Sequence, residues 1–216
     1  MVSDSFLFLD HGSDRLLVWF GGRDEPFLSD KMCKATGCDV LSIKNVRGDW
    51  FIGGLFGIEG GIEGMTSWLG EQIKRKPYRR VFFAGQSSGG YAALKFAHTY
   101  KPHAAIVFNP STQNWPAGSK AVCPTRVWGK DKIITNLNEL YRDQPVTFPI
   151  VYSVGRSEKD HYVKWHWNDL EHAKYFKDMD NVTYIQHPFD THVLTVALAK
   201  KGMFYSFVAA FTTLYS

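Results

Sequence analysis

The sequence has little cysteine and little excess of charge. Its three cysteines, Cys33, Cys38 and Cys123, are an odd number, which predicts no disulfide framework and favours a reducing, cytoplasmic location. No second Cys/His pair at ligand spacing accompanies Cys33 and Cys38, so we expect no zinc site. The formal net charge is +4, with one tight basic run at 74–80. We interpret that run as a solvated helix end, and we expect no nucleic-acid partner.

Long apolar runs are missing as well. Asp10 interrupts the first apolar run, no basic region precedes it, and so no signal peptide is predicted. The apolar stretch Met203–Leu214 is too short to cross a bilayer, so we expect no integral membrane segment. Its large side chains fall at helical spacing and predict a terminal helix packed on the body of the protein: Phe204, Phe207, Val208 and Phe211.

What the sequence does contain is an alternation of short apolar runs and helical segments. Strands are predicted at Phe6–Leu9, Leu16–Phe20, Asp39–Ile43, Arg80–Ala84, Ala104–Phe108, Pro149–Val154 and Val182–Ile185. Helices are predicted over about 65–74, 89–100 and 169–176, and again from near Val193. The first two strands flank the turn 10–14 and are predicted to pair as a hairpin.

This alternation predicts an α/β fold with a mostly parallel central sheet and helices on both faces. We expect residues 1–216 to form a single domain, with a small cap or lid at about 110–148. The aromatic residues of that stretch, Trp115, Trp128 and Tyr141, are suited to an acyl pocket, to sugar stacking or simply to cap packing. In parallel sheets ligands bind at the carboxyl ends of the strands, so the loops after strands should carry the chemistry.

One such loop holds a specific motif. Gly85-Gln86-Ser87-Ser88-Gly89 matches G-x-S-x-G and lies between the apolar strand 80–84 and a helix rich in alanine. The glycines allow a tight turn that thrusts Ser87 outward at a helix N-terminus. Ser87 is therefore the predicted nucleophile. The weaker alternatives are a turn without catalytic role and a phosphate site at the helix N-terminus.

A serine nucleophile requires a base and an acid, in the chain order Ser, acid, His. Two histidines follow the last strand, and His192 is preferred over His187 because it lies in the loop before the terminal helices. The acid should follow strand 149–154. There we favour Asp160, with Asp169 as the alternate and Glu158 as a weaker third candidate.

The oxyanion formed during acyl transfer needs backbone N–H donors. The N–H of Ser88, directly after the nucleophile, is the first predicted donor. The second should come from the glycine turn after strand 16–20, where we assign Gly22 and keep Gly21 and Arg23 as alternatives.

On these motifs the sequence resembles the α/β-hydrolase superfamily, over most of its length. Together with the motif around Ser87, the segments Val46–Phe51 and Val107–Pro110 look like a branch of small bacterial serine hydrolases of poorly defined substrate, some of them associated with surface-polysaccharide genes. The resemblance implies a serine hydrolase that cleaves an ester or thioester and needs no cofactor. Acyl transfer to a glycan or amine acceptor and a non-catalytic binding module are the alternatives. The expected partner is a small-molecule or glycan-linked acyl substrate.

Overall fold

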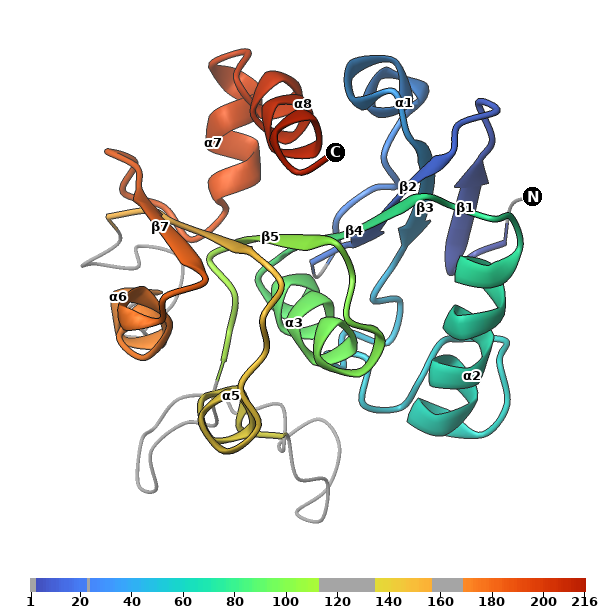
Figure 1. Ribbon diagram of the computed structural model, residues 1–216, viewed down its shortest axis with the longest axis horizontal. Coiled ribbons are helices and arrows are strands. Elements are labelled where there is room, and N and C mark those ends of the chain that lie inside the picture. The colour runs from blue at the N-terminus through green and yellow to red at the C-terminus, as the bar shows by residue number, and fades with distance from the viewer. Residues whose placement is uncertain (1–2, 23, 113–134, 157–168) are drawn as a thin grey trace.

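The computed structural model of the chain describes residues 3–22, 24–112, 135–156 and 169–216 (Figure 1). Its strands form one seven-stranded sheet in the order β1-β3-β2-β4-β5-β6-β7. Their bounds are β1 Phe6–Leu9, β2 Arg15–Phe20, β3 Asp39–Ile43, β4 Arg80–Gln86, β5 Ala104–Phe108, β6 Ile150–Val154 and β7 Val182–Gln186. All neighbouring strands are parallel except β1 and β3. The predicted mostly parallel sheet is therefore confirmed.

The predicted hairpin between the first two strands is wrong. β1 pairs antiparallel with β3, with Phe6 opposite Ile43, and β3 separates it from β2. The connection between β1 and β2 passes over the start of β3, where Asp39 Oδ1 accepts the N–H groups of His11 and Ser13 at 2.8 and 3.0 Å. Period-2 patterning identifies strands but not their partners, and a short turn alone favoured the wrong pairing.

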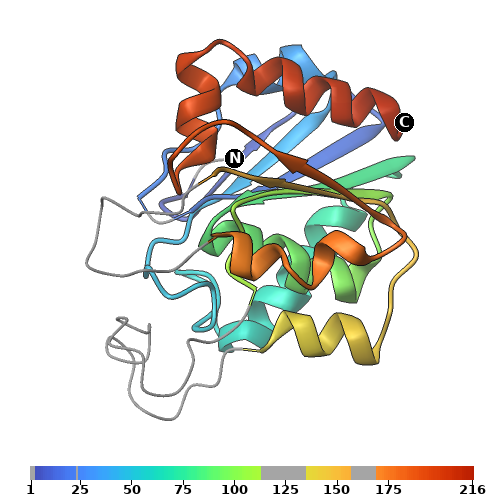
Figure 2. The same ribbon diagram turned by 90° about the vertical axis from the view of Figure 1, so that its left-hand side faces the viewer.

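Helices cover both faces of the sheet (Figures 1 and 2). One layer contains α1 Asp30–Thr36, α7 Leu194–Lys200 and α8 Phe204–Leu214. The other contains α2 Gly61–Lys74, α3 Ser88–Tyr100, α5 Leu137–Asp143, α6 Asp169–Ala173 and the 3₁₀ turn η1 Phe176–Asp178. The short helices α1 and α5 were not predicted, since seven residues carry too little helical periodicity to identify them. The predicted cap stretch contains α5, and its residues 113–134 lie outside the described ranges.

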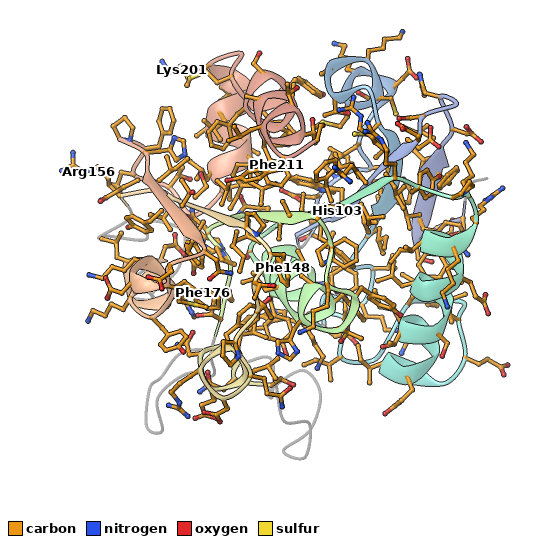
Figure 3. The ribbon with its side chains drawn as sticks, in the orientation of Figure 1. His103, Phe148, Arg156, Phe176, Lys201 and Phe211 are labelled. Atoms are coloured by element: carbon orange, nitrogen blue, oxygen red, sulfur yellow. The ribbon has the colours of Figure 1, made fainter. Side chains whose placement is uncertain are left out.

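Side chains of the strands contribute to two hydrophobic cores, one on each face of the sheet. In β2, Leu16, Val18 and Phe20 enter the core beneath α2 and α3, whereas Leu17 and Trp19 enter the core beneath α7 and α8. Figure 3 shows this division, with Phe211 of α8 on one side of the sheet and Phe148 and Phe176 on the other. Burial on both faces explains why the strands are continuous apolar runs rather than alternating ones.

The two C-terminal helices form as predicted. Phe204, Val208 and Phe211 of α8 are buried in the core beneath them. Among the described residues, no single helix is long and apolar enough to cross a membrane, although α7 and α8 together, bent by 108°, meet that length and composition.

The basic run at 74–80 joins the end of α2 to the start of β4, as the interpretation of a solvated helix end requires. Lys76 Nζ lies 2.8 Å from the buried Asp39 Oδ2, and Arg79 pairs with Asp14 at 2.9 Å. The pair of Lys76 with the buried Asp39 connects this run to the start of β3, at the opposite end of the sheet from Ser87, whereas the exposed pair Arg79–Asp14 contributes little.

Candidate active site

Ser87 lies on a sharp turn between β4 and α3. Its backbone has φ 55° and ψ −120°, a conformation that residues other than glycine rarely adopt. The turn is fixed from two sides, because the Ser87 N–H donates to Phe108 O at 2.9 Å and the Ser87 carbonyl accepts from Tyr91 N at 3.0 Å. Strain of this kind persists only where the surrounding structure imposes it, and it is concentrated at functional sites.

The two glycines of the motif are required by close approaches of the backbone. A Cβ atom on Gly85 would lie 2.3 Å from the Gly89 carbonyl oxygen. A Cβ atom on Gly89 would lie 2.0 Å from the carbonyl oxygen of Phe20, at the end of β2. The sequence motif thus reflects how tightly α3 packs against the ends of β2 and β4.

A continuous hydrogen-bond chain leads from Ser87 to a buried carboxylate. The Ser87 Oγ lies 2.7 Å from His192 Nε2, and His192 Nδ1 lies 2.8 Å from Asp169 Oδ1. The Asp169 side chain is 2% exposed and the His192 side chain 31%. Since an ionised carboxylate only accepts, Nδ1–H donates to Asp169, and Nε2 is left to accept the Ser87 hydroxyl proton.

The residues of this chain come from loops far apart in the sequence. Ser87 follows β4, Asp169 begins α6 after β6, and His192 follows β7, so all three lie at the carboxyl ends of parallel strands. The favoured acid, Asp160, and the weaker candidate Glu158 lie outside the described residues. Asp169, the alternate acid, is the carboxylate found at His192.

Two amide side chains that the sequence analysis missed hold the His192 loop in place. Gln86 Nε2 donates to His192 O at 2.9 Å, and Asn109 Nδ2 donates to the same oxygen at 2.7 Å. Asn109 also accepts the Gly155 N–H at 2.8 Å, which links the loops after β5, β6 and β7. Both amides stand at the carboxyl ends of strands, and a polar residue directly after a buried strand was the available signal.

The N–H groups predicted to bind an oxyanion differ in their surroundings. Ser88 is the first residue of α3, where N–H groups have no acceptor within the helix. Its buried side-chain hydroxyl accepts from Asn45 Nδ2 at 3.1 Å. The Gly22 N–H donates to Glu25 Oε2 at 2.8 Å, because Glu25 folds back on the turn.

The sequence predicted that the Gly22 N–H would be available to substrate, whereas in the structure it already donates to Glu25. Of the two alternatives, the Gly21 N–H donates to Ile43 O at 2.8 Å, and Arg23 lies outside the described residues. The N–H groups of Gly21 and Gly22 therefore both have acceptors within the protein, whereas Ser88 directly follows Ser87 as the first residue of α3.

The other histidines have different surroundings. His187 Nε2 lies 2.6 Å from the Ser153 hydroxyl, its ring stacks on Phe189, and burial lowers its pKa. His172 is almost fully buried, and its Nδ1 accepts from Thr112 N at 2.9 Å. Burial, and to a smaller extent the charge of His192, holds the pKa of His172 well below its usual value. Three further histidines of the described chain are exposed or partly exposed: His11, His98 and His103.

In the described ranges, no three His, Cys, Asp or Glu side chains gather in a way that would hold a metal ion. Cys33 and Cys38 are buried free thiols, and burial raises the pKa of Cys33 to about 11. A thiol with a raised pKa is a poor metal ligand and a poor nucleophile at neutral pH.

Solved structures provide the comparison with known proteins. A monoacylglycerol lipase of Paleococcus ferrophilus is 13% identical, with a TM-score of 0.63 over 98% of both chains. A capsule O-acetyltransferase of Neisseria meningitidis serogroup A is 17% identical, with a TM-score of 0.61 over 96% of this chain and 90% of the other. A fluorophosphonate-binding serine hydrolase of Staphylococcus aureus, FphF, is 13% identical, with a TM-score of 0.58 over 94% and 83%.

No protein-family model matches the chain, and no curated protein sequence matches it either. At identities of 13–17% the likeness to solved structures shows the fold alone. The chain has the α/β-hydrolase fold, as its motifs predicted. The fold alone does not determine the function of the chain.

Proposed function

We propose that this protein is a serine hydrolase that cleaves an ester or thioester through an acyl-enzyme on Ser87. The observation that carries the proposal is the chain of hydrogen bonds Ser87–His192–Asp169, built on a strained turn at the N-terminus of α3. A nucleophile, a base and an orienting acid in this order are the groups that acyl transfer requires.

The reaction follows from the geometry of these groups. The Ser87 oxygen attacks the substrate carbonyl while its proton moves to His192 Nε2, 2.7 Å away. The Ser88 N–H stabilises the oxyanion, and Asp169 stabilises the imidazolium. Collapse of the tetrahedral intermediate breaks the bond to the alcohol or thiol, which takes the proton from His192. Water, deprotonated by His192, then attacks the acyl-enzyme and releases the acid and free Ser87.

The test is covalent labelling of the folded protein with a fluorophosphonate, which reacts with activated serines. We expect the wild type to be labelled, and Ser87→Ala and His192→Ala to remain unlabelled while folded. The wild type should hydrolyse a short-chain ester, and both variants should lose most of that rate. A folded wild type that takes no label and cleaves no ester would overturn the proposal.

Acyl transfer with the same residues is the second candidate. The similarity to a capsule O-acetyltransferase, at a TM-score of 0.61, favours it. The two reactions share the acyl-enzyme and differ in whether water or an acceptor hydroxyl or amine resolves it. Adding an oligosaccharide acceptor to an acetyl-ester assay separates them, because transfer lowers the acetate released per alcohol released.

The buried free thiols Cys33 and Cys38 support a reducing, cytoplasmic location for this activity.

A further inference from the structure

Glu25 joins two loops that lie far apart in the sequence. It follows β2 and is partly buried beside the turn that contains Gly22. One carboxylate oxygen accepts the Gly22 N–H at 2.8 Å, and the other accepts the Thr195 hydroxyl of α7 at 3.0 Å. The carboxylate therefore fixes the turn after β2 against the start of α7.

The hydrogen bonds continue from Thr195 to the site. The Thr195 N–H donates to Gln86 Oε1 at 3.2 Å, and Gln86 Nε2 donates to His192 O at 2.9 Å. Gln86 directly precedes Ser87, so this path passes along the turn that carries the nucleophile. One series of hydrogen bonds thus runs from Gly22 through Glu25, Thr195 and Gln86 to the His192 loop.

The surroundings of Glu25 are mostly apolar. It lines a cavity of about 240 Å³ together with residues of β2, α7 and α8: Trp19, Thr195, Phe204 and Tyr205 among them. Burial raises the pKa of Glu25, and the hydrogen bonds from Gly22 and Thr195 and the charge of His192 oppose that shift. By the same interaction, a charged Glu25 favours the imidazolium form of His192.

We propose that Glu25 is a positioning residue of the hydrolase, holding the turn after β2 and the His192 loop in register with Ser87. This inference rests on the proposed function, because register between these loops matters only if Ser87 and His192 react. Sub-ångström placement of reacting groups is worth about 10²-fold in rate.

The test compares Glu25→Ala, Glu25→Gln and Thr195→Val with the wild type, in fluorophosphonate labelling and in ester hydrolysis across pH. Glu25→Ala removes both hydrogen bonds, so we expect kcat and the labelling rate to fall about 10²-fold, with a smaller change in KM. Thr195→Val removes one bond and keeps the N–H to Gln86, so its loss should be smaller. Glu71 is an exposed residue of α2. Glu71→Ala is the matched control and should behave as wild type.

Glu25→Gln separates charge from shape. Its amide oxygen still accepts the Gly22 N–H, so its loss of rate should be smaller than that of Glu25→Ala. The variant also removes the negative charge that favours the imidazolium form of His192. The acid limb of kcat/KM should therefore move to lower pH, which a purely structural role would not cause.

The outcomes separate the two proposals. If the folded wild type takes no label and cleaves no ester, the proposed function fails. If the wild type is labelled and Glu25→Ala reacts at the wild-type rate, the role of Glu25 is overturned and the proposed function stands. A Glu25→Ala that reacts faster would show that Glu25 blocks an N–H donor, which also overturns positioning. If Glu25→Ala does not fold, an unchanged acid limb in Glu25→Gln overturns the inference.

Discussion

Among the described residues, two serine–histidine pairs lie at the carboxyl ends of strands. Ser87 and His192 are 2.7 Å apart, and Ser153 and His187 are 2.6 Å apart. The hydrogen bond itself therefore does not distinguish a nucleophile from a packing contact. The two pairs differ in their surroundings.

The pair Ser153–His187 is enclosed. Ser153 is fully buried in β6, His187 packs edge-on against Phe207, and no ion pair reaches His187 from the described residues. In the pair Ser87–His192, a carboxylate contacts the second ring nitrogen, the imidazole is partly exposed, and the serine lies on a strained turn. Ser87 and the His192 ring are thus partly exposed, whereas Ser153 and His187 are buried, and of these two rings only that of His192 has a carboxylate of the described residues on its second nitrogen.

The largest effect should come from making the reactive pair resemble the enclosed one. Asp169→Asn removes the negative charge beside His192 Nδ1 and replaces one accepting oxygen with an NH2 donor, which no longer fixes the tautomer, so kcat/KM should fall by about 10³–10⁴-fold. Steady-state hydrolysis of a short-chain ester measures it. Asp160→Asn is the control and should stay near wild type. A larger loss in Asp160→Asn than in Asp169→Asn would show that Asp160 is the acid.

A smaller effect should follow from removing a side chain that holds the loop of His192. Asn109→Ala removes the amide that holds the carbonyls of Thr191 and His192, and kcat should fall about 10²-fold with a smaller change in KM. Asn181→Ala is the control. It removes a comparable hydrogen bond away from the site, from the Asn181 side-chain amide to Phe148 O at 2.7 Å. If the two variants lose equal activity, Asn109 has no special role in placing His192.

The smallest effect on rate should come from the enclosed pair itself. Ser153→Ala and His187→Phe should keep the ester-hydrolysis rate but lose about 1–2 kcal/mol of unfolding free energy. Loss of activity without loss of stability in either variant would contradict this division of roles.

His187 also gives a pH dependence of stability. Its pKa is lowered in the folded chain, so the unfolded chain binds the proton more readily. Its contribution is complete above the unfolded pKa of about 6.5 and decreases as the pH falls towards the folded value. Urea unfolding of His187→Phe should therefore show less acid destabilisation than wild type. A remainder should persist, because His172 is buried with a lowered pKa too.

The sequence was most informative where structure depends on neighbouring residues. The turn at Ser87 was predictable because its glycines, its strand and its helix are contiguous. His192 was predictable from chain order, and its preference over His187 agrees with the surroundings of the two rings. The α/β architecture followed from strands that are apolar throughout, as in β5.

Features set by distant contacts could not be predicted in this way. Nothing local shows that β3 lies between β1 and β2, because Asp39 holds the crossing turn from another part of the chain. Asp160 and Asp169 both follow β6, and which one meets His192 depends on the path of the loop. Glu25 gave no signal either, since its partner Thr195 is 170 residues away.

The positive φ of Ser87 has a consequence for the evolution of the protein. A glycine would adopt that backbone conformation without strain, whereas a serine there costs about 1–3 kcal/mol. Selection for stability alone would therefore favour loss of the hydroxyl at this position. The proposed role as nucleophile gives a reason for a serine here, because glycine has no hydroxyl to attack a carbonyl.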